Sequence, residues 1–333
     1  MSTRYIAATT LLLFCLAASF QTPSAEPVTG SYLEHPAFPD FARRMKSRHG
    51  FGDAEMKQLF ADVTRQQSII DAISRPAETK PWHEYRKIFM TEERIKGGAD
   101  FWKLHKETLD QAATTFNVDP EMIVAIIGVE TFYGRITGNY PVITALATLG
   151  FDYAPRRRFF LGELEQFLVL TREESFDPKN ILGSYAGAMG ASQFIASSYR
   201  QYAVDFDFDN QRNLWQSWPD IIGSVANYFK QAGWKKGGLI AIPAVGKEKE
   251  NQSGIVRKGK TAEFRAAGFV FSEGIADERD VMLISLEQPE EYEYWVAMHN
   301  YSVIMKYNRS PLYAMAAYQL SQAILNARAD HAR

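Results

Sequence analysis

Glu130 is the residue whose place in the sequence points most directly to chemistry. It follows the apolar run 122–129, and the residues seven, four and three positions before it are Ile123, Ile126 and Ile127. It therefore extends an apolar helix face near the negative end of the helix dipole, and both conditions raise the pKa of a carboxyl group. A raised pKa suits a general acid working near neutral pH. A buried structural glutamate paired with Arg135 is the alternative, and position alone does not separate the two.

A second candidate site is the run 183–194, Gly-Ser-Tyr-Ala-Gly-Ala-Met-Gly-Ala-Ser-Gln-Phe. Its small residues allow a ligand to approach the backbone, and Ser184 and Gln193 add a hydroxyl and an amide. That combination suits a sugar, which needs many hydrogen bonds. A tight helix junction explains the glycines equally well. A phosphate-binding loop is excluded, because no Gly-Lys-Ser/Thr follows.

Three carboxylates occupy alternate positions at Asp205, Asp207 and Asp209. This spacing is typical of the start of a calcium loop. Gln216 stands where an EF-hand has its closing glutamate, so the loop needs Asp220 to close it from a longer segment. The alternative is a solvated acidic turn.

Aromatic, amide and basic side chains supply further candidates for sugar binding. They are Tyr228, Tyr307, Asn308 and Tyr313, with the basic cluster Arg156, Arg157 and Arg158. Tyrosines at helical spacing are more often core residues, and an arginine run is more often a solvated helix start. The arginines would otherwise face an acidic ligand.

These residues require a mainly helical scaffold. Apolar spacing predicts amphipathic helices over 53–74 and 101–116. Between them and the glycine-rich run, Asp119 and Pro120 favour the start of a buried helix that Gly134 can stop.

The later part of the chain has a different sequence pattern. Short β-rich runs at 239–245, 268–272 and 281–286, interrupted by the charged stretch 247–260, predict a small inserted β-subdomain. Helix is expected again from Tyr294, and Ser310-Pro311 opens a last helix to about Ala327.

Composition narrows the function classes. The chain has 333 residues, 46% of them hydrophobic, and a formal net charge of −2. It can bury a large core in two or three lobes, and its charge gives no general attraction to nucleic acid. The histidines lack metal-ligand spacing, and neither Gly-x-Ser-x-Gly nor Gly-x-Gly-x-x-Gly occurs, which argues against zinc enzymes, serine hydrolases and dinucleotide binding.

The N-terminus has the layout of a secretory signal peptide. Arg4 precedes the apolar run 5–20, and small residues continue to Ala25. The run is shorter than a membrane span requires, so a mature protein without a transmembrane segment is expected in the periplasm. Cys15, the one cysteine, lies inside the run after bulky Phe14, which disfavours lipoprotein anchoring and leaves no thiol nucleophile.

Taken together, the motifs resemble those of the lytic murein transglycosylase B family. The likeness runs from about residue 35 to the C-terminus and rests on the order and spacing of Glu130-Thr-Phe-Tyr-Gly-Arg135, Ala145-Leu-Ala-Thr-Leu149, Ser184-Tyr-Ala-Gly-Ala-Met-Gly190, Gln193-Phe194, Asn213-Leu-Trp215, Gly223-Ser-Val-Ala-Asn-Tyr-Phe229 and Tyr307-Asn-Arg-Ser310.

The resemblance implies an α+β fold, mainly α, in which a lysozyme-like helical core carries a helical lobe and a small inserted β-subdomain. We expect a signal peptide at 1–25, an N-terminal helical lobe at 26–100, the catalytic core at 101–236, the β-subdomain at 237–293, and C-terminal helices completing the core at 294–333.

The resemblance also assigns roles residue by residue. Glu130 matches the catalytic glutamate. The substrate-binding positions are Ser184, Gln193, Tyr228, Tyr307, Asn308, Tyr313, Arg156 and Arg157. A structural calcium ion would take Asp205, Asp207, Asp209, the Gln211 carbonyl and Asp220.

The implied reaction uses one carboxylate. Glu130 would cleave the β-1,4 bond between N-acetylmuramic acid and N-acetylglucosamine in peptidoglycan and leave a 1,6-anhydro ring, without a catalytic cofactor. A muramidase that uses water, and a non-catalytic peptidoglycan-binding protein on the same fold, are the alternatives. The expected partner is the glycan strand, no nucleic acid is expected, and nothing demands more than a monomer.

Overall fold

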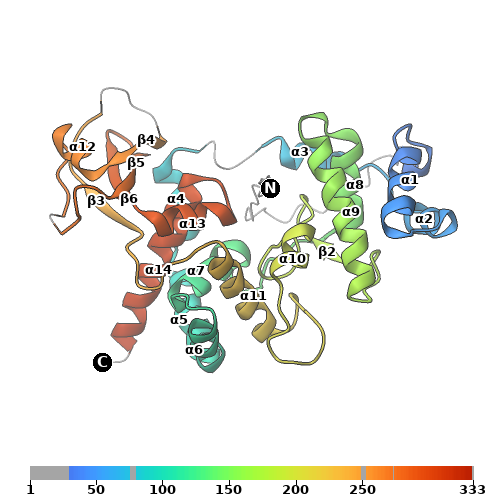
Figure 1. Ribbon diagram of the computed structural model, residues 1–333, viewed down its shortest axis with the longest axis horizontal. Helices are drawn as coiled ribbons and strands as arrows, with labels where there is room; N and C mark the ends of the chain where they lie inside the picture. Colours follow the sequence, from blue (N-terminus) through green and yellow to red (C-terminus); the bar gives the residue numbers. More distant parts are fainter. Residues whose placement is uncertain (1–29, 76–79, 249–252, 273, 332–333) are drawn as a thin grey trace, which may run out of the picture. The chain divides into compact units, whose positions relative to one another are not determined.

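The computed structural model describes residues 30–75, 80–248, 253–272 and 274–331, and it is mainly helical with small antiparallel sheets (Figure 1). The α+β, mainly α prediction is therefore confirmed. The chain divides into two compact units, one made of residues 1–76 and 134–221, the other of residues 77–133 and 222–333. The expected signal peptide at 1–25 lies outside the described residues.

The first unit is built from helices around a two-stranded sheet of β1 and β2. Its elements are η1 (Tyr32–Glu34), α1 (Phe38–His49), α2 (Asp53–Phe60), α3 (Gln67–Ile73), β1 (Tyr140–Pro141), α8 (Val142–Asp152), η3 (Ala154–Arg156), α9 (Arg157–Glu173), β2 (Leu182–Gly183), α10 (Ala196–Tyr202) and the start of α11 (Trp218–Gln231).

The second unit combines helices with a four-stranded sheet. Its elements are α4 (Trp82–Phe89), α5 (Glu92–Leu104), α6 (Lys106–Thr115), α7 (Pro120–Thr131), the remainder of α11, β3 (Ala241–Ala244), β4 (Gly254–Lys260), α12 (Thr261–Ala266), β5 (Asp280–Glu287), β6 (Tyr292–Ala297), α13 (His299–Tyr307) and α14 (Pro311–His331).

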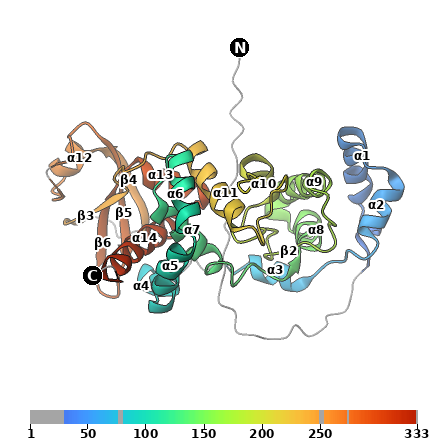
Figure 2. The same cartoon turned by 90° about the horizontal axis from the view of Figure 1, so that it is seen from below.

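Helix α7 is the centre of the second unit. All its residues from Met122 to Thr131 are buried, and it packs against α5 and α14 (Figure 2). A helix that is apolar all round requires neighbours on every side. Pro120 begins the helix, as expected, because proline lacks the amide hydrogen that a first-turn residue would leave unpaired.

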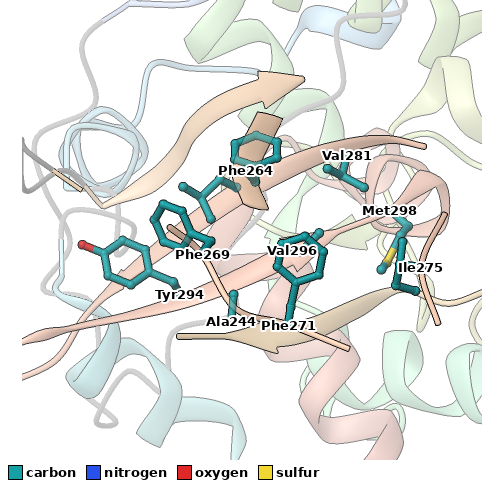
Figure 3. Close-up of a cluster of buried hydrophobic side chains, with 10 residues drawn as sticks. Ala244, Phe264, Phe269, Phe271, Ile275, Val281, Tyr294, Val296 and Met298 are labelled. Carbon is teal, nitrogen blue, oxygen red and sulfur yellow. The ribbon is translucent and has the colours of Figure 1, made fainter. Parts of the chain in front are cut away.

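The four-stranded sheet is antiparallel, in the order β3-β6-β5-β4. Aromatic and aliphatic side chains from the sheet and from the segment after β4 fill one core, among them Phe264, Phe269, Val281 and Val296 (Figure 3). This core gives the inserted β-rich part its own hydrophobic interior.

Two predicted helices are each divided in two. The segment 53–74 forms α2 and α3, separated by a turn where Thr64 bridges to Ser31. The segment 101–116 breaks at His105 between α5 and α6, and Leu104 beside the break is 78% exposed. The apolar spacing continued across both breaks, so periodicity alone missed them.

The β-rich region also differs in detail from expectation. The run 268–272 makes only an isolated bridge, between Val270 and Val245. The expected return to helix at Tyr294 is wrong, since β6 continues to Ala297. Strand β4 lies within the charged stretch that had been read as a separator. That strand is at the sheet edge, where lysine and arginine are common because they discourage pairing with other chains.

Among the described residues, no single helix has the length and apolar content needed to cross a membrane. Helices α6 and α7 meet that test only as a pair, and they are bent by 115° relative to one another.

Candidate functional site

Glu130 occupies the last turn of α7 and is 3% exposed. Burial raises its pKa to about 8, and a hydrogen bond of 2.5 Å donated by the Tyr313 hydroxyl to its Oε1 partly opposes that rise. No cation and no second carboxylate among the described residues contributes to the shift. Glu130 is therefore protonated at neutral pH, and the alternative of a buried ion pair has no support.

The start of α14 positions Tyr313. The Ser310 hydroxyl accepts a hydrogen bond from the Tyr313 amide, and the Asn308 side chain accepts one from the Ser310 amide. Buried Tyr301 donates to the Pro311 carbonyl at 2.6 Å. These contacts fix the first turn of the helix, as N-capping residues do. The expected helix start at Ser310-Pro311 thus has a direct role in holding Tyr313 against Glu130.

Two more of the predicted tyrosines pack together in the same unit. The rings of Tyr228 and Tyr307 lie 4.7 Å apart between centroids, and Tyr228 donates to the Lys306 carbonyl at 2.5 Å. Burial and the nearby carboxyl group of Glu130 raise the pKa of Tyr307. The Tyr307 hydroxyl therefore stays protonated at neutral pH and can serve as a neutral hydrogen-bonding group.

The chain leaves α7 through a strained turn that sequence reasoning missed. The helix ends at Thr131, before Gly134, and its left-handed cap is Phe132 with a φ of 51°, followed by Tyr133 with a φ of 59°. Bulky residues adopt this conformation only when the surroundings enforce it. Such strain is commonly found beside functional residues.

A slot between glycines holds Tyr133 in that conformation. Its hydroxyl donates to the Arg94 carbonyl at 2.8 Å. A Cβ atom added at Gly98 would lie only 2.5 Å from that hydroxyl oxygen, and one added at Gly128 only 2.6 Å from it. Both positions therefore need glycine. The Gly97-Gly98 pair inside a helical pattern was the sequence signal for this slot. Tyr85 on α4 was also missed, although its hydroxyl helps to raise the pKa of Tyr313.

In the first unit, Ser184 closes a tight turn. Its hydroxyl oxygen accepts hydrogen bonds from the Ala186 and Ala188 amides, at 3.3 and 3.1 Å. A serine hydroxyl has two acceptor positions and one donor. With both acceptors engaged, its hydrogen is the group left for a ligand.

Gln193 is buried in the same unit with a left-handed backbone, φ 50°. Its Nε2 donates to the carbonyls of Thr137 and Gly190, at 3.0 and 2.9 Å. Two carbonyl acceptors require the NH2 group on that side, which fixes the amide orientation. Its Oε1 is buried without a hydrogen-bond partner among the described residues. A buried acceptor in this condition is costly unless a ligand supplies the donor.

The two predicted arginines differ in their surroundings. Arg156 lies over the rings of Phe159 and Phe160. Burial raises the pKa of nearby Glu163, and the charge of Arg156 opposes that rise only in part. Arg157, at the first position of α9, is exposed. The N-terminus of a helix is the end that attracts anions, so Arg157 adds its charge to that attraction.

The acidic loop brings three of the five expected metal ligands together. Carboxylate oxygens of Asp205, Asp207 and Asp209 all lie within 4.8 Å of one another. Left-handed backbone at Phe208 and Asn210 curls the loop, and asparagine adopts this conformation more readily than most residues do. Three converging carboxylates repel one another, and hard oxygen ligands of this kind fit calcium.

Asp220 is fully buried beneath this loop. Its two oxygens accept hydrogen bonds from the Phe206 and Asn213 amides, both at 2.7 Å, and thereby tie together the two ends of the loop. It does not belong to the group of three carboxylates. Gln211 is exposed, and its backbone N–H donates a hydrogen bond to the Asp209 carboxylate.

The predicted site residues thus fall into two sets. Glu130, Tyr228, Tyr307, Asn308 and Tyr313 belong to the second unit. The first unit holds Arg156, Arg157, Ser184, Gln193, Asp205, Asp207, Asp209, Gln211 and Asp220.

Comparison with known proteins places the chain in a family. Residues 34–322 match the model of the transglycosylase SLT domain. The chain is 40% identical over 309 residues to the membrane-bound lytic murein transglycosylase B of Escherichia coli strain K12, covering 90% of this chain and 85% of that protein.

Solved structures agree with this assignment. The soluble lytic transglycosylase SltB1 from Pseudomonas aeruginosa is 47% identical with a TM-score of 0.82, over 88% of this chain and 100% of that one. Escherichia coli Slt35 in complex with calcium is 39% identical with a TM-score of 0.84, over 91% and 96%. The chain therefore belongs to the lytic murein transglycosylase family, whose members are peptidoglycan-cleaving lyases with a lysozyme-like fold.

Proposed function

We propose that Glu130 alone serves as acid and then as base in the cleavage of peptidoglycan. Its carboxyl group first protonates the oxygen of the β-1,4 bond between N-acetylmuramic acid and N-acetylglucosamine, and the bond from that oxygen to C1 breaks. The resulting carboxylate then takes the proton of the muramyl C6 hydroxyl, whose oxygen closes on C1. Glu130 ends protonated, as it began, and the muramyl end carries a 1,6-anhydro ring.

The burial of Glu130 is the observation that carries this proposal. A pKa near 8 keeps the acid protonated at neutral pH, as the first step needs. The Tyr313 hydroxyl, 2.5 Å away, can stabilise the carboxylate that exists between the two steps. Most glycosidases use two carboxylates, and a second one near Glu130 would raise its pKa further, whereas none of the described residues contributes in that way.

The remaining predicted residues would bind the substrate. The Ser184 hydrogen can be donated to a sugar oxygen, and the unpartnered Gln193 Oε1 can accept from a hydroxyl or an acetamido N–H. Tyr307 and Tyr228 would supply aromatic rings, and Asn308 would supply an amide. Arg156 and exposed Arg157 would face the carboxylates of the lactyl-peptide stems.

Calcium would have a structural role. Asp205, Asp207 and Asp209, with the Gln211 carbonyl, would hold the ion, while Asp220 joins the loop to the start of α11. The ion would relieve the repulsion among the carboxylates and stiffen the loop. No chemical step requires it, and we propose no other cofactor.

We further propose that the mature protein works in the periplasm as a monomer. The layout of residues 1–25 supports secretion, and Phe14 before Cys15 argues against lipid attachment. The relative from Escherichia coli is described as membrane-bound, so the proposal predicts that the two proteins differ in membrane attachment.

Digestion of purified peptidoglycan in water enriched in oxygen-18, followed by mass spectrometry, tests the reaction. We expect muramyl ends with an anhydro ring and no incorporated oxygen-18. Reducing ends that carry oxygen-18 would make the enzyme a muramidase that uses water, and would overturn the second step.

A further inference from the structure

A second site lies in the second unit, in a pocket of about 660 Å³ between α4, the β5–β6 turn and α14. Its lining includes neither Glu130 nor Tyr313, which donates a hydrogen bond to Glu130. The first residue of α14 that lines the pocket is Tyr318, five residues after Tyr313. Gln322, which also lines it, is about 14 Å along the helix from Tyr313. The pocket is therefore separate from the catalytic glutamate, although both belong to one compact unit.

An aromatic wall forms one side of this pocket. Trp295 on β6 meets the ring of Tyr318 edge to face, at 6.2 Å and 86°. The indole N–H of Trp295 donates to Glu293, and the Tyr318 hydroxyl donates to the Ala241 carbonyl at 3.0 Å. Both polar edges are thus occupied, which fixes the rings. A fixed tryptophan and tyrosine pair is suited to stacking against the apolar face of a sugar.

Two cations in the last turn of α4, Arg86 and Lys87, also line the pocket. The Nε of Arg86 donates to the Gln319 side chain at 2.6 Å, which orients the guanidinium and leaves its terminal nitrogens without a partner in the described structure. Lys87 is exposed and likewise makes no hydrogen bond or ion pair with the described residues. Cations at a helix C-terminus complement its dipole, which explains why both residues occur there but not why Gln319 orients the guanidinium of Arg86.

Charge and amides complete the lining. Glu293 is the one acid among the lining residues, and its oxygens are engaged by Trp295 and by the Gln288 amide, the latter at 2.6 Å. The amides of Gln322 and Asn326 also face the pocket. An oriented guanidinium recognises a carboxylate with two parallel hydrogen bonds, and amides suit hydroxyl and acetamido groups.

We propose that this pocket is a non-catalytic binding site for a muramyl unit of the glycan strand whose lactyl carboxylate carries no stem peptide. The aromatic wall takes the sugar face, the amides take its polar substituents, and Arg86 with Lys87 takes the carboxylate. This site would hold a strand on the enzyme apart from the bond being cleaved. The proposal rests on the peptidoglycan substrate class, but not on how Glu130 works.

A binding experiment on full-length Glu130→Gln protein tests it, because that variant does not consume the ligand. The tryptophans are labelled as 5-fluorotryptophan, and the fluorine signal of Trp295 is assigned with Trp295→Phe. We expect the disaccharide of N-acetylglucosamine and N-acetylmuramic acid to move that signal saturably. The double change Arg86→Gln and Lys87→Gln should weaken this binding by at least about tenfold.

Lys57→Gln is the matched control, because Lys57 is an exposed cation in the last turn of another helix, α2. It should leave the titration unchanged, and all variants should melt at the parent temperature. A trimer of N-acetylglucosamine, which lacks a carboxylate, should bind about tenfold more weakly. The stem peptide without sugar should not bind at all.

Three results would overturn the proposal. These are a Trp295 signal that does not move while other tryptophan signals do, equal binding of the neutral trimer, and binding of the peptide alone. Failure of the proposed catalytic mechanism would be seen separately, in the products of the wild-type enzyme.

Discussion

Replacing Glu130 by Gln should stabilise the protein, and by an amount that depends on pH. In the folded state the pKa of Glu130 is about 8, compared with 4.5 for an unburied glutamate. Between these values the unfolded chain is ionised while the folded one still holds its proton. The folded state therefore binds more protons, and the free energy of unfolding falls as pH rises through this window.

The size of the effect follows from the two pKa values. Between about pH 5 and about pH 8.5, burial of Glu130 should remove about 4 kcal/mol from the free energy of unfolding of the wild type. Glutamine has no proton to lose and can still accept the Tyr313 hydrogen bond. The difference between variant and wild type should therefore grow by about the same amount across that range and level off above it.

Urea unfolding followed by circular dichroism at a series of pH values measures this difference. Glu92→Gln, which changes an exposed glutamate at the start of α5, should show a nearly constant difference. A difference for Glu130→Gln that is also independent of pH would refute the raised pKa and, with it, the reason for assigning Glu130 as the acid.

Three further perturbations have definite outcomes. Tyr313→Phe removes a hydrogen bond that lowers the pKa of Glu130, so the alkaline limb of the activity profile should move to higher pH, with a loss of about 1–2 kcal/mol in urea unfolding; a limb that moves to lower pH would contradict this. Gly98→Ala places a Cβ 2.5 Å from the Tyr133 hydroxyl, so it should lower the free energy of unfolding by about 1–3 kcal/mol and remove most of the turnover. Its control is Gly162→Ala on α9, where the added Cβ meets open space. That variant should raise the free energy of unfolding by about 0.5–1 kcal/mol and leave turnover unchanged. Calcium at about a hundredfold excess over its dissociation constant should stabilise the wild type by about 2.7 kcal/mol in thermal unfolding, and Asp207→Asn should remove most of that gain; equal gains in both proteins would show that the loop is not the calcium site.

The sequence was most informative where a single local pattern determines the structure. The apolar surroundings of Glu130 predicted its burial, because a helix that is apolar all round has no exposed face to offer a carboxylate. Pro120 and Ser310-Pro311 marked two helix starts correctly. Alternate spacing was enough to indicate that Asp205, Asp207 and Asp209 converge.

Contacts between distant segments set the limits of that approach. The end of α7 depends on Tyr133 entering a slot lined by Gly98, which belongs to another helix. Strand β4 is charged because it is a sheet edge, and edge position cannot be read from a single strand. The role of Asp220 depends on the backbone amides at both ends of its loop. Sequence periodicity contains none of this information.

The pocket beside Trp295 is the clearest example of a feature hidden from the sequence. Its lining comes from α4, from the β5–β6 region and from α14, three segments that lie far apart in the chain. Arg86 and Trp295 are unremarkable residues until the fold places them around the same space.

The central claim is that Glu130 supplies both proton transfers, and the most direct test compares the wild type with Glu130→Gln on intact peptidoglycan. Mass spectrometry of the released sugars and a strand-binding assay should be carried out on the same preparations. We predict anhydromuramyl products from the wild type, a loss of at least about a thousandfold in turnover for the variant, and undiminished strand binding. Turnover by the variant at the wild-type rate would contradict the account and remove Glu130 from the mechanism.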